Sequence, residues 1–210
     1  MKRSDIVRIG IASDYSWNPV ALPAVLEAYG CRVFVEHIFS MDELVAFFNS
    51  PAVDAQFTVV HTHGWGKTDE EAVINWPLFD QQTWKVSDFH LTPRNMGEIV
   101  KKGAGTLIVT ACWSGKEAFA RGFFEAGFDH YIAPTCSSDC SSALQFLTAF
   151  FGYLRYEERE YKPREVGIAE AVELSRRIDD FPDGASAWRY FGRTTIDAGK
   201  KSDAVEPATS

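Results

Sequence analysis

The chain has 210 residues, of which 46% are hydrophobic and 24% charged, a composition typical of a globular protein with a large core. Its formal net charge is −8, from 21 Lys and Arg against 29 Asp and Glu, which argues against general nucleic-acid binding because no basic stripe is present to neutralise phosphates. No apolar run approaches the roughly 20 residues that a membrane-spanning helix needs, so we expect no membrane partner.

Predicted strands and helices alternate along the chain, and most of them end at glycine, proline or capping residues. Short apolar runs predict strands at residues 7–13, 32–38, 57–63, 106–111, 130–134 and 187–196. The spacing of apolar residues predicts helices at about residues 19–29, 40–48, 93–102, 115–126, 141–155 and 164–178. Residues 67–92 are polar and aromatic, and are predicted to be irregular or to form a hairpin. We expect one domain over residues 1–198 and a disordered tail over residues 199–210.

This alternation is typical of an α/β fold, a three-layer sandwich in which a mostly parallel central sheet has helices on both faces. In such sheets, ligands bind beyond the carboxyl ends of the strands. Two of the predicted strands end in reactive side chains beside glycines, in the segments His61-Thr62-His63-Gly64-Trp65 and Ala111-Cys112-Trp113-Ser114-Gly115. If the two strands are neighbours, an imidazole and a thiol meet where chemistry usually takes place.

A cysteine next to a histidine is suited to nucleophilic catalysis. A free thiol is only slightly ionised at neutral pH, and an imidazole such as that of His63 can take its proton during attack. Cys112 precedes a predicted helix, whose N-terminus favours negative charge. The backbone N–H groups of Gly64 and Cys112 are candidate donors to an oxyanion.

These motifs resemble those of caspase-like cysteine peptidases, the clan of caspases, metacaspases, separase and CHAT-domain peptidases. His63 lies 49 residues before Cys112 (112 − 63), and caspases carry their histidine about 50 residues upstream of the cysteine. The segment from Thr110 to Gly115 has one residue more before the glycine than the caspase Gln-Ala-Cys-x-Gly, and looks more like bacterial CHAT peptidases. The resemblance covers about residues 5 to 197, and includes residues 89–93, 127–139 and 188–192.

The resemblance implies cleavage of a peptide or protein substrate by a Cys112–His63 dyad, with neither a metal nor an organic cofactor. In CHAT and separase relatives an aspartate near the position of Asp139 binds a basic side chain, which implies cleavage after Arg or Lys. Cys136 stands where those relatives carry tryptophan. True caspases hold aspartate with arginines instead, a role open to Arg189. Trp65 and Trp113 are candidates for the walls of the substrate cleft.

The resemblance also bears on regulation. The segment between the cysteine and the next strand holds one predicted helix and a short turn, so we expect a single-chain enzyme that needs no cleavage there. Regulation would then come from another protein chain. Stand-alone bacterial relatives often belong to defence or cell-death systems.

The four cysteines, Cys31, Cys112, Cys136 and Cys140, are expected to be reduced thiols in a cytoplasmic protein, because residues 1–5 lead into a strand rather than an apolar signal segment. The Cys136–Cys140 pair has only His130 close by in sequence, and a zinc site would need two further ligands. The His61-x-His63 pattern likewise has no clear third ligand. We therefore expect no metal site, and interpret His61 as structural.

Two alternatives stay open from the residues alone. Amidotransferase-like enzymes also place a cysteine after a parallel strand, but their histidine follows it, and His130 could take that part. An inactive caspase-like scaffold would bind a partner without using Cys112.

Overall fold

The computed structural model describes residues 5–12, 21–50, 55–80, 85–138, 140–155, 166–177 and 187–194. Several expectations fall outside these ranges. They are the role of Asp139, the tail over residues 199–210, and the outer ends of the predicted segments at 19–29, 164–178 and 187–196.

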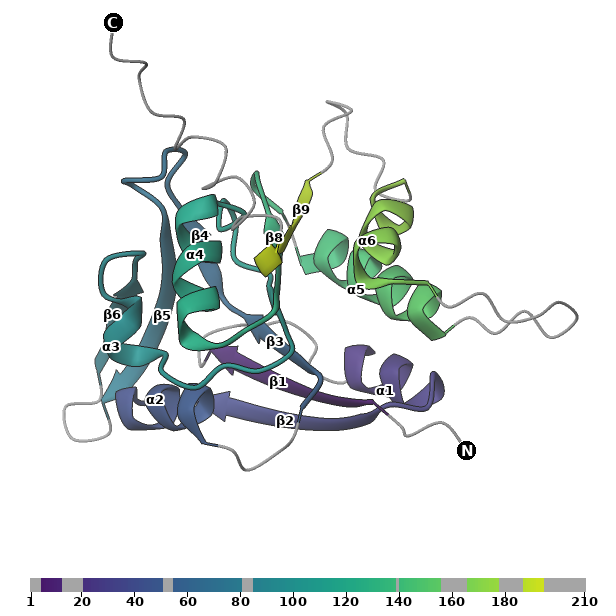
Figure 1. Cartoon of the computed structure of the whole chain (residues 1–210). Helices are drawn as coiled ribbons and strands as arrows, with labels where there is room; N and C mark the ends of the chain where they lie inside the picture. The colour runs from purple at the N-terminus through teal and green to yellow at the C-terminus, as the bar shows by residue number, and fades with distance from the viewer. Residues whose placement is uncertain are drawn as a thin grey trace, which may run out of the picture.

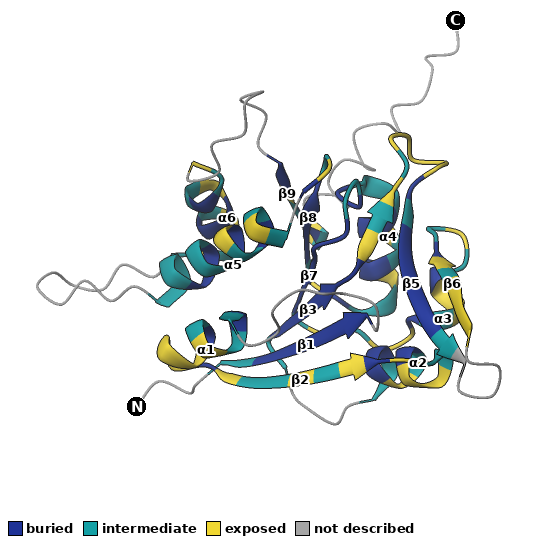
Figure 2. Ribbon diagram, turned by 180° about the vertical axis from the view of Figure 1, so that it is seen from behind, coloured by how far each residue is buried: buried dark blue, intermediate teal, exposed yellow. Residues whose placement is uncertain are grey.

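The core of the fold is a six-stranded sheet with strand order β2-β1-β3-β7-β8-β9 (Figure 1). Its strands are β1 (Ile6–Ala12), β2 (Arg32–Ile38), β3 (Phe57–His61), β7 (Thr106–Val109), β8 (His130–Pro134) and β9 (Trp188–Gly192). All neighbouring pairs are parallel except β8 and β9, which are antiparallel. The central strands are almost wholly buried, whereas β2 is an exposed edge (Figure 2).

Helices cover both faces of this sheet. The helices are α1 (Ala21–Ala28), α2 (Met41–Asn49), α3 (Met96–Ile99), α4 (Glu117–Ala126), α5 (Cys140–Arg155) and α6 (Ile168–Arg176). One apolar cluster joins α1, α5 and α6 to one face, and the other joins α2, α3 and α4 to the opposite face (Figure 1). Because strand side chains alternate, Val59 belongs to the first cluster and Val60 to the second. The predicted three-layer α/β sandwich is confirmed.

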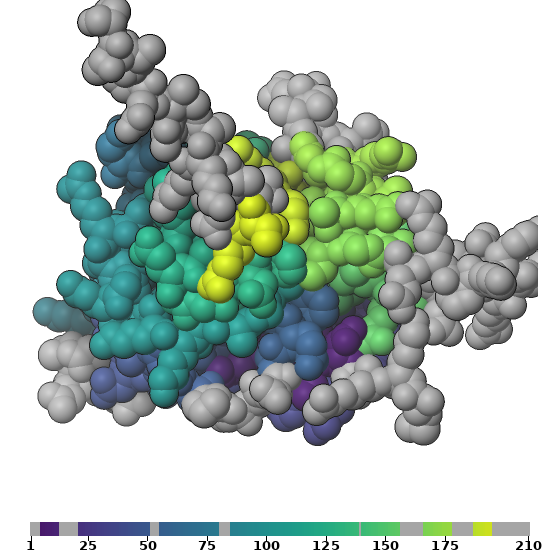
Figure 3. Space-filling model, in the orientation of Figure 1, coloured from purple at the N-terminus to yellow at the C-terminus, as the bar shows by residue number. Residues whose placement is uncertain are grey.

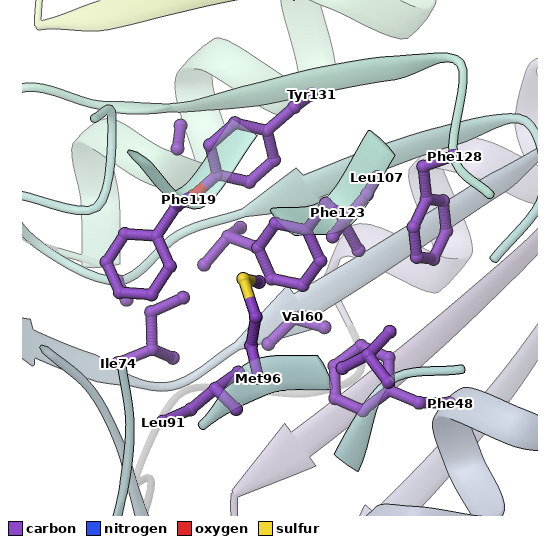
Figure 4. Close-up of a cluster of buried hydrophobic side chains, with 14 of the residues drawn as sticks. Phe48, Val60, Ile74, Leu91, Met96, Leu107, Phe119, Phe123, Phe128 and Tyr131 are labelled. Atoms are coloured by element: carbon purple, nitrogen blue, oxygen red, sulfur yellow. The ribbon is translucent and has the colours of Figure 1, made fainter. Parts of the chain in front are cut away.

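The core under α4 combines aliphatic side chains with a group of aromatic rings (Figure 4). The ring of Phe123 lies 5.1 Å from that of Tyr131 and 6.1 Å from that of Phe128, measured between centroids. On the surface, β9 lies between α4 and the α5–α6 pair (Figure 3). This packing fixes β7 and β8 between two helical layers, and so holds the end of β7 in place.

A second, three-stranded antiparallel sheet lies beside the α2–α4 layer, with the strand order β4 (His63–Trp65), β5 (Val73–Asp80), β6 (Lys85–Leu91). The predicted hairpin is thus present. The predicted strand at 57–63 is split, because Thr62 leaves the parallel sheet and its hydroxyl donates a hydrogen bond to the carbonyl of Asn75 on β5. His63 consequently belongs to the small sheet.

The helix predicted at 93–102 is much shorter than expected, since α3 spans Met96–Ile99. Tertiary hydrogen bonds take the chain out of the helix after this point. The N–H of Lys101 donates to the Asn49 side chain at 2.7 Å, and the N–H of Gly103 donates to the carbonyl of Ala126 at 2.7 Å. Within the described residues, no helix is long and apolar enough to cross a bilayer.

Candidate active site

The two segments singled out from the sequence meet at one edge of the central sheet. β3 and β7 are parallel neighbours, with Val60 opposite Val109 in the register. The N–H of Thr110 donates to the carbonyl of Val60 at 2.9 Å, which extends the pairing beyond the end of β7. The strands that lead to His63 and to Cys112 therefore end side by side.

His61 lies beneath this edge and ties the two strands together. Its side chain is 0% exposed, and its Nδ1 shares a hydrogen bond with the hydroxyl of Thr110 at 2.7 Å. Burial lowers the pKa of His61 to about 3, with a smaller contribution from the neighbouring His63. His61 is therefore neutral at physiological pH, in keeping with a structural role.

The residue after His63 packs directly against the peptide of Cys112. A Cβ atom on Gly64 would lie 2.4 Å from the carbonyl oxygen of Cys112 and 2.9 Å from the Cβ of Ala111. Only glycine permits this approach, because both distances are shorter than real Cβ contacts. The backbone of Gly64 and the residue Cys112 are thus in contact, and His63 stands next to them with an exposed side chain.

The turn that carries Cys112 is tightly constrained. Among the described residues other than glycine, Trp113 alone has a positive φ, 62°. The hydroxyl of Ser114 donates to the carbonyl of Ala111 at 2.6 Å, and the buried Tyr131 hydroxyl donates to the carbonyl of Ser114 at 2.8 Å. A left-handed residue held by buried hydrogen bonds is strain of the kind that clusters at functional sites.

The extension of β8 holds the other side of this turn. The N–H of Gly115 donates to the carbonyl of Pro134 at 2.7 Å, and that of Trp113 donates to the carbonyl of Cys136 at 3.1 Å. A Cβ on Gly115 would lie 2.8 Å from the carbonyl oxygen of Ala133, so this contact also requires glycine. Because β8 is anchored in both helical layers, the turn has little freedom to move.

The Cys112 thiol, which is partly buried, contacts two serines that the sequence interpretation missed. Sγ donates to the carbonyl of Ser138 at 3.3 Å and accepts a hydrogen bond from the N–H of Ser138 at 3.3 Å. The hydroxyl of Ser137 lies 4.0 Å from Sγ. No motif could have indicated Ser138, because it acts through its backbone.

The two tryptophans lie close to this centre. Trp65 is 42% exposed and packs edge-on against His90, with ring centroids 5.0 Å apart. The Lys67 ammonium lies 5.8 Å from the centroid of the Trp113 ring, and Lys116 donates to the carbonyl of Lys67 at 2.6 Å. The β4–β5 turn is thus attached to the turn that carries Cys112.

His130 is at the wrong end of the sheet to serve as a partner for Cys112. It begins β8 and stands opposite Thr106, the first residue of β7, whereas Cys112 follows the end of β7. Each strand residue advances about 3.3 Å, so the length of β7 alone adds about 10 Å of separation. The His130 ring instead lies on Tyr190, with Nδ1 at 3.0 Å from its hydroxyl, and burial lowers its pKa. The amidotransferase-like assignment of His130 is therefore wrong.

Arg189 and Asp139 are the two candidates for substrate specificity. Arg189 on β9 stands opposite Ala133, near the end of β8, and its guanidinium lies 4.6 Å from the ring centroid of Phe191. Asp139 lies outside the described residues.

Within the part of the chain that the structure describes, no three His, Cys, Asp or Glu side chains are grouped so that they could hold a metal ion. The four cysteines are present as thiols.

The mostly parallel sheet with helices on both faces is consistent with the caspase-like fold of a solved neighbour. The chain is similar to a solved structure from Porphyromonas gingivalis, a complex of the pro- and mature domains of RgpB, with a TM-score of 0.57 and 14% sequence identity. The similarity covers 90% of this chain and 47% of the RgpB chain, so this chain spans about half the length of its neighbour. No family model matches the sequence, and no curated protein matches it.

Proposed function

We propose that this protein is a cysteine endopeptidase in which Cys112 is the nucleophile and His63 its partner base. The observation that carries the proposal is the contact of Gly64 with Cys112 at the ends of two parallel neighbouring strands. This contact puts the residue after the histidine against the backbone of the cysteine. The caspase-like fold supports the same reading at the level of architecture.

In the proposed reaction, His63 takes the thiol proton while Sγ of Cys112 attacks the carbonyl carbon of the scissile bond. The oxyanion that forms accepts hydrogen bonds from the N–H groups of Gly64 and Cys112. His63 then gives its proton to the leaving amine, and a thioester to Cys112 remains. Water, deprotonated by His63, hydrolyses the thioester and restores the thiol.

The choice of base is tested by comparing His63→Ala with His130→Ala on fluorogenic peptides that contain Arg, Lys and Asp cleavage sites. We expect His63→Ala to lower kcat/KM by about 10²- to 10⁴-fold, as is usual for loss of a general base. His130→Ala should stay close to wild type, because His130 is at the far end of β8. Loss of activity in the His130 variant with an active His63 variant would overturn the proposed dyad.

For specificity we propose cleavage after Arg or Lys, with the carboxylate of Asp139 holding the basic side chain. Asp139→Ala should then reduce kcat/KM for Arg and Lys substrates by about 10- to 100-fold, the value of a charge-assisted hydrogen bond. Arg189→Ala is the matched variant, and should leave these substrates unaffected. Cleavage after Asp that is lost in Arg189→Ala would instead establish the preference of true caspases.

A further inference from the structure

The small sheet brings three polar side chains into one row beside the candidate active site. In the register of the three strands, His63 on β4 stands opposite Asn75 on β5, which stands opposite His90 on β6. Residues directly opposite each other in an antiparallel pair point to the same face, with Cβ atoms about 4.5 to 5.5 Å apart. The amide of Asn75 is therefore the direct cross-strand neighbour of the His63 imidazole.

Asn75 is buried and held in one orientation. It is 5% exposed, and its Nδ2 donates to the carboxylate of Asp88 at 3.1 Å. A carboxylate can only accept, so the NH₂ group of the amide must face Asp88. The oxygen Oδ1 then faces away from Asp88, and among the residues that the structure describes no donor contacts it. A buried acceptor without a partner is costly, typically by more than the net value of a hydrogen bond.

His63 is the more suitable donor of the two histidines that flank Asn75. The ring of His90 is engaged edge-on with Trp65, at an interplanar angle of 88°. The exposed His63 side chain stands directly across from Asn75, so Oδ1 is a candidate acceptor for its ring N–H, and catalytic hydrogen bonds are often long before substrate binds.

We propose that Asn75 is the positioning residue of His63, accepting a hydrogen bond from one ring N–H so that the other ring nitrogen faces Cys112. This inference rests on the proposed function, because it concerns the base of that reaction. Asn75 selects one tautomer of the neutral imidazole and supports the imidazolium that forms when the thiol is deprotonated. Asp88 in turn keeps the amide from flipping.

The test uses the full chain with the variants Asn75→Leu, Asn75→Asp and the double variant Asn75→Asp/Asp88→Asn. Asn75→Leu removes the acceptor at similar volume, and should lower kcat by about 10- to 100-fold with little change in KM. Asn75→Asp keeps an acceptor oxygen at position 75, but places a second carboxylate next to that of Asp88. The double variant restores the donor at position 88, and should recover most of the lost kcat.

The matched control is Asn49→Leu, because the Asn49 side chain is also bonded inside the fold, at 2.6 Å to the carbonyl of Ile99 and 2.7 Å to the N–H of Lys101. Asn49→Leu should lower the free energy of unfolding without a selective loss of kcat. A second readout is the ¹⁵N spectrum of the His63 imidazole, which should show one tautomer in wild type and a mixture in Asn75→Leu. This signal does not depend on turnover.

Wild-type kcat and one His63 tautomer in a folded Asn75→Leu variant would overturn the inference and leave the dyad standing. The inference would also be overturned, with the dyad left standing, if His90→Ala lost as much kcat as Asn75→Leu while the His63 tautomer stayed unchanged. An inactive wild type whose His63 tautomer still depends on Asn75 would overturn the peptidase function and support the positioning contact.

Discussion

Replacing Cys112 with alanine is expected to reduce peptide hydrolysis by about 10⁴-fold or more, because the covalent intermediate can no longer form. The thiol is partly buried and is held by hydrogen bonds to Ser138, so alanine leaves only a small gap at the protein surface. The melting temperature should shift by no more than about 2 to 4 °C, which corresponds to about 1 kcal/mol for a chain of this size. The measurement is a progress curve with fluorogenic peptides, together with thermal unfolding.

Cys31→Ala is the matched control, because Cys31 is buried immediately before β2, near Arg155, and burial raises the pKa of its thiol. Its removal should leave hydrolysis unchanged. Alkylation by iodoacetamide at neutral pH should label Cys112 before Cys31. An active Cys112→Ala variant would contradict the proposed nucleophile. An inactive wild type whose Cys112 resists alkylation would favour the scaffold alternative, in which the fold binds a partner without catalysis.

Replacing Gly64 with alanine is expected to lower kcat by about 10²- to 10³-fold, the usual effect of losing one oxyanion donor. The added methyl group would meet the carbonyl oxygen of Cys112 at 2.4 Å and Ala111 at 2.9 Å, so one of the two backbone segments must move away. We expect either movement to disturb the proposed pair of N–H donors, those of Gly64 and Cys112. Steady-state kinetics should show the loss in kcat with a smaller change in KM.

Gly97→Ala provides the control, because Gly97 lies in α3 and a Cβ there would meet nothing within 4 Å. That variant should be fully active, and is expected to gain slightly in stability from the higher helix propensity of alanine. If Gly64→Ala were folded and fully active, the proposed oxyanion site at Gly64 would be wrong. Far-UV circular dichroism of both variants separates loss of fold from loss of chemistry.

Much of the secondary structure follows from local patterns. The capping box of α2 is an example, since Ser40 and Glu43 hydrogen-bond each other's backbone as the motif predicts. The order of strands and helices, and hence the three-layer class, follows from apolar periodicity in the same way. These features depend on residues a few positions apart, so the sequence is sufficient to predict them.

The predicted ends of one strand and one helix were wrong, because these ends depend on contacts with residues far away in the chain. The strand ending at His61 was expected to continue to His63, but Thr62 turns toward the backbone of Asn75, which is 13 residues away. The helix after Pro93 is short because the N–H of Lys101 donates to the side chain of Asn49, 52 residues earlier in the chain, instead of continuing the helix. Tertiary hydrogen bonds outweigh local propensity in both places.

The sequence by itself determined the α/β class and singled out a histidine and a cysteine at the ends of two predicted strands, because strand ends and glycine-flanked reactive residues are local signals. Only the tertiary structure decided that the strands leading to His63 and Cys112 are parallel neighbours, and that His130 lies at the opposite end of β8 from Cys112. It also brought Ser138 and Asn75 to the site, one through its backbone and one across a sheet. Contacts of this kind join residues far apart in the chain, and no local pattern of side chains encodes them.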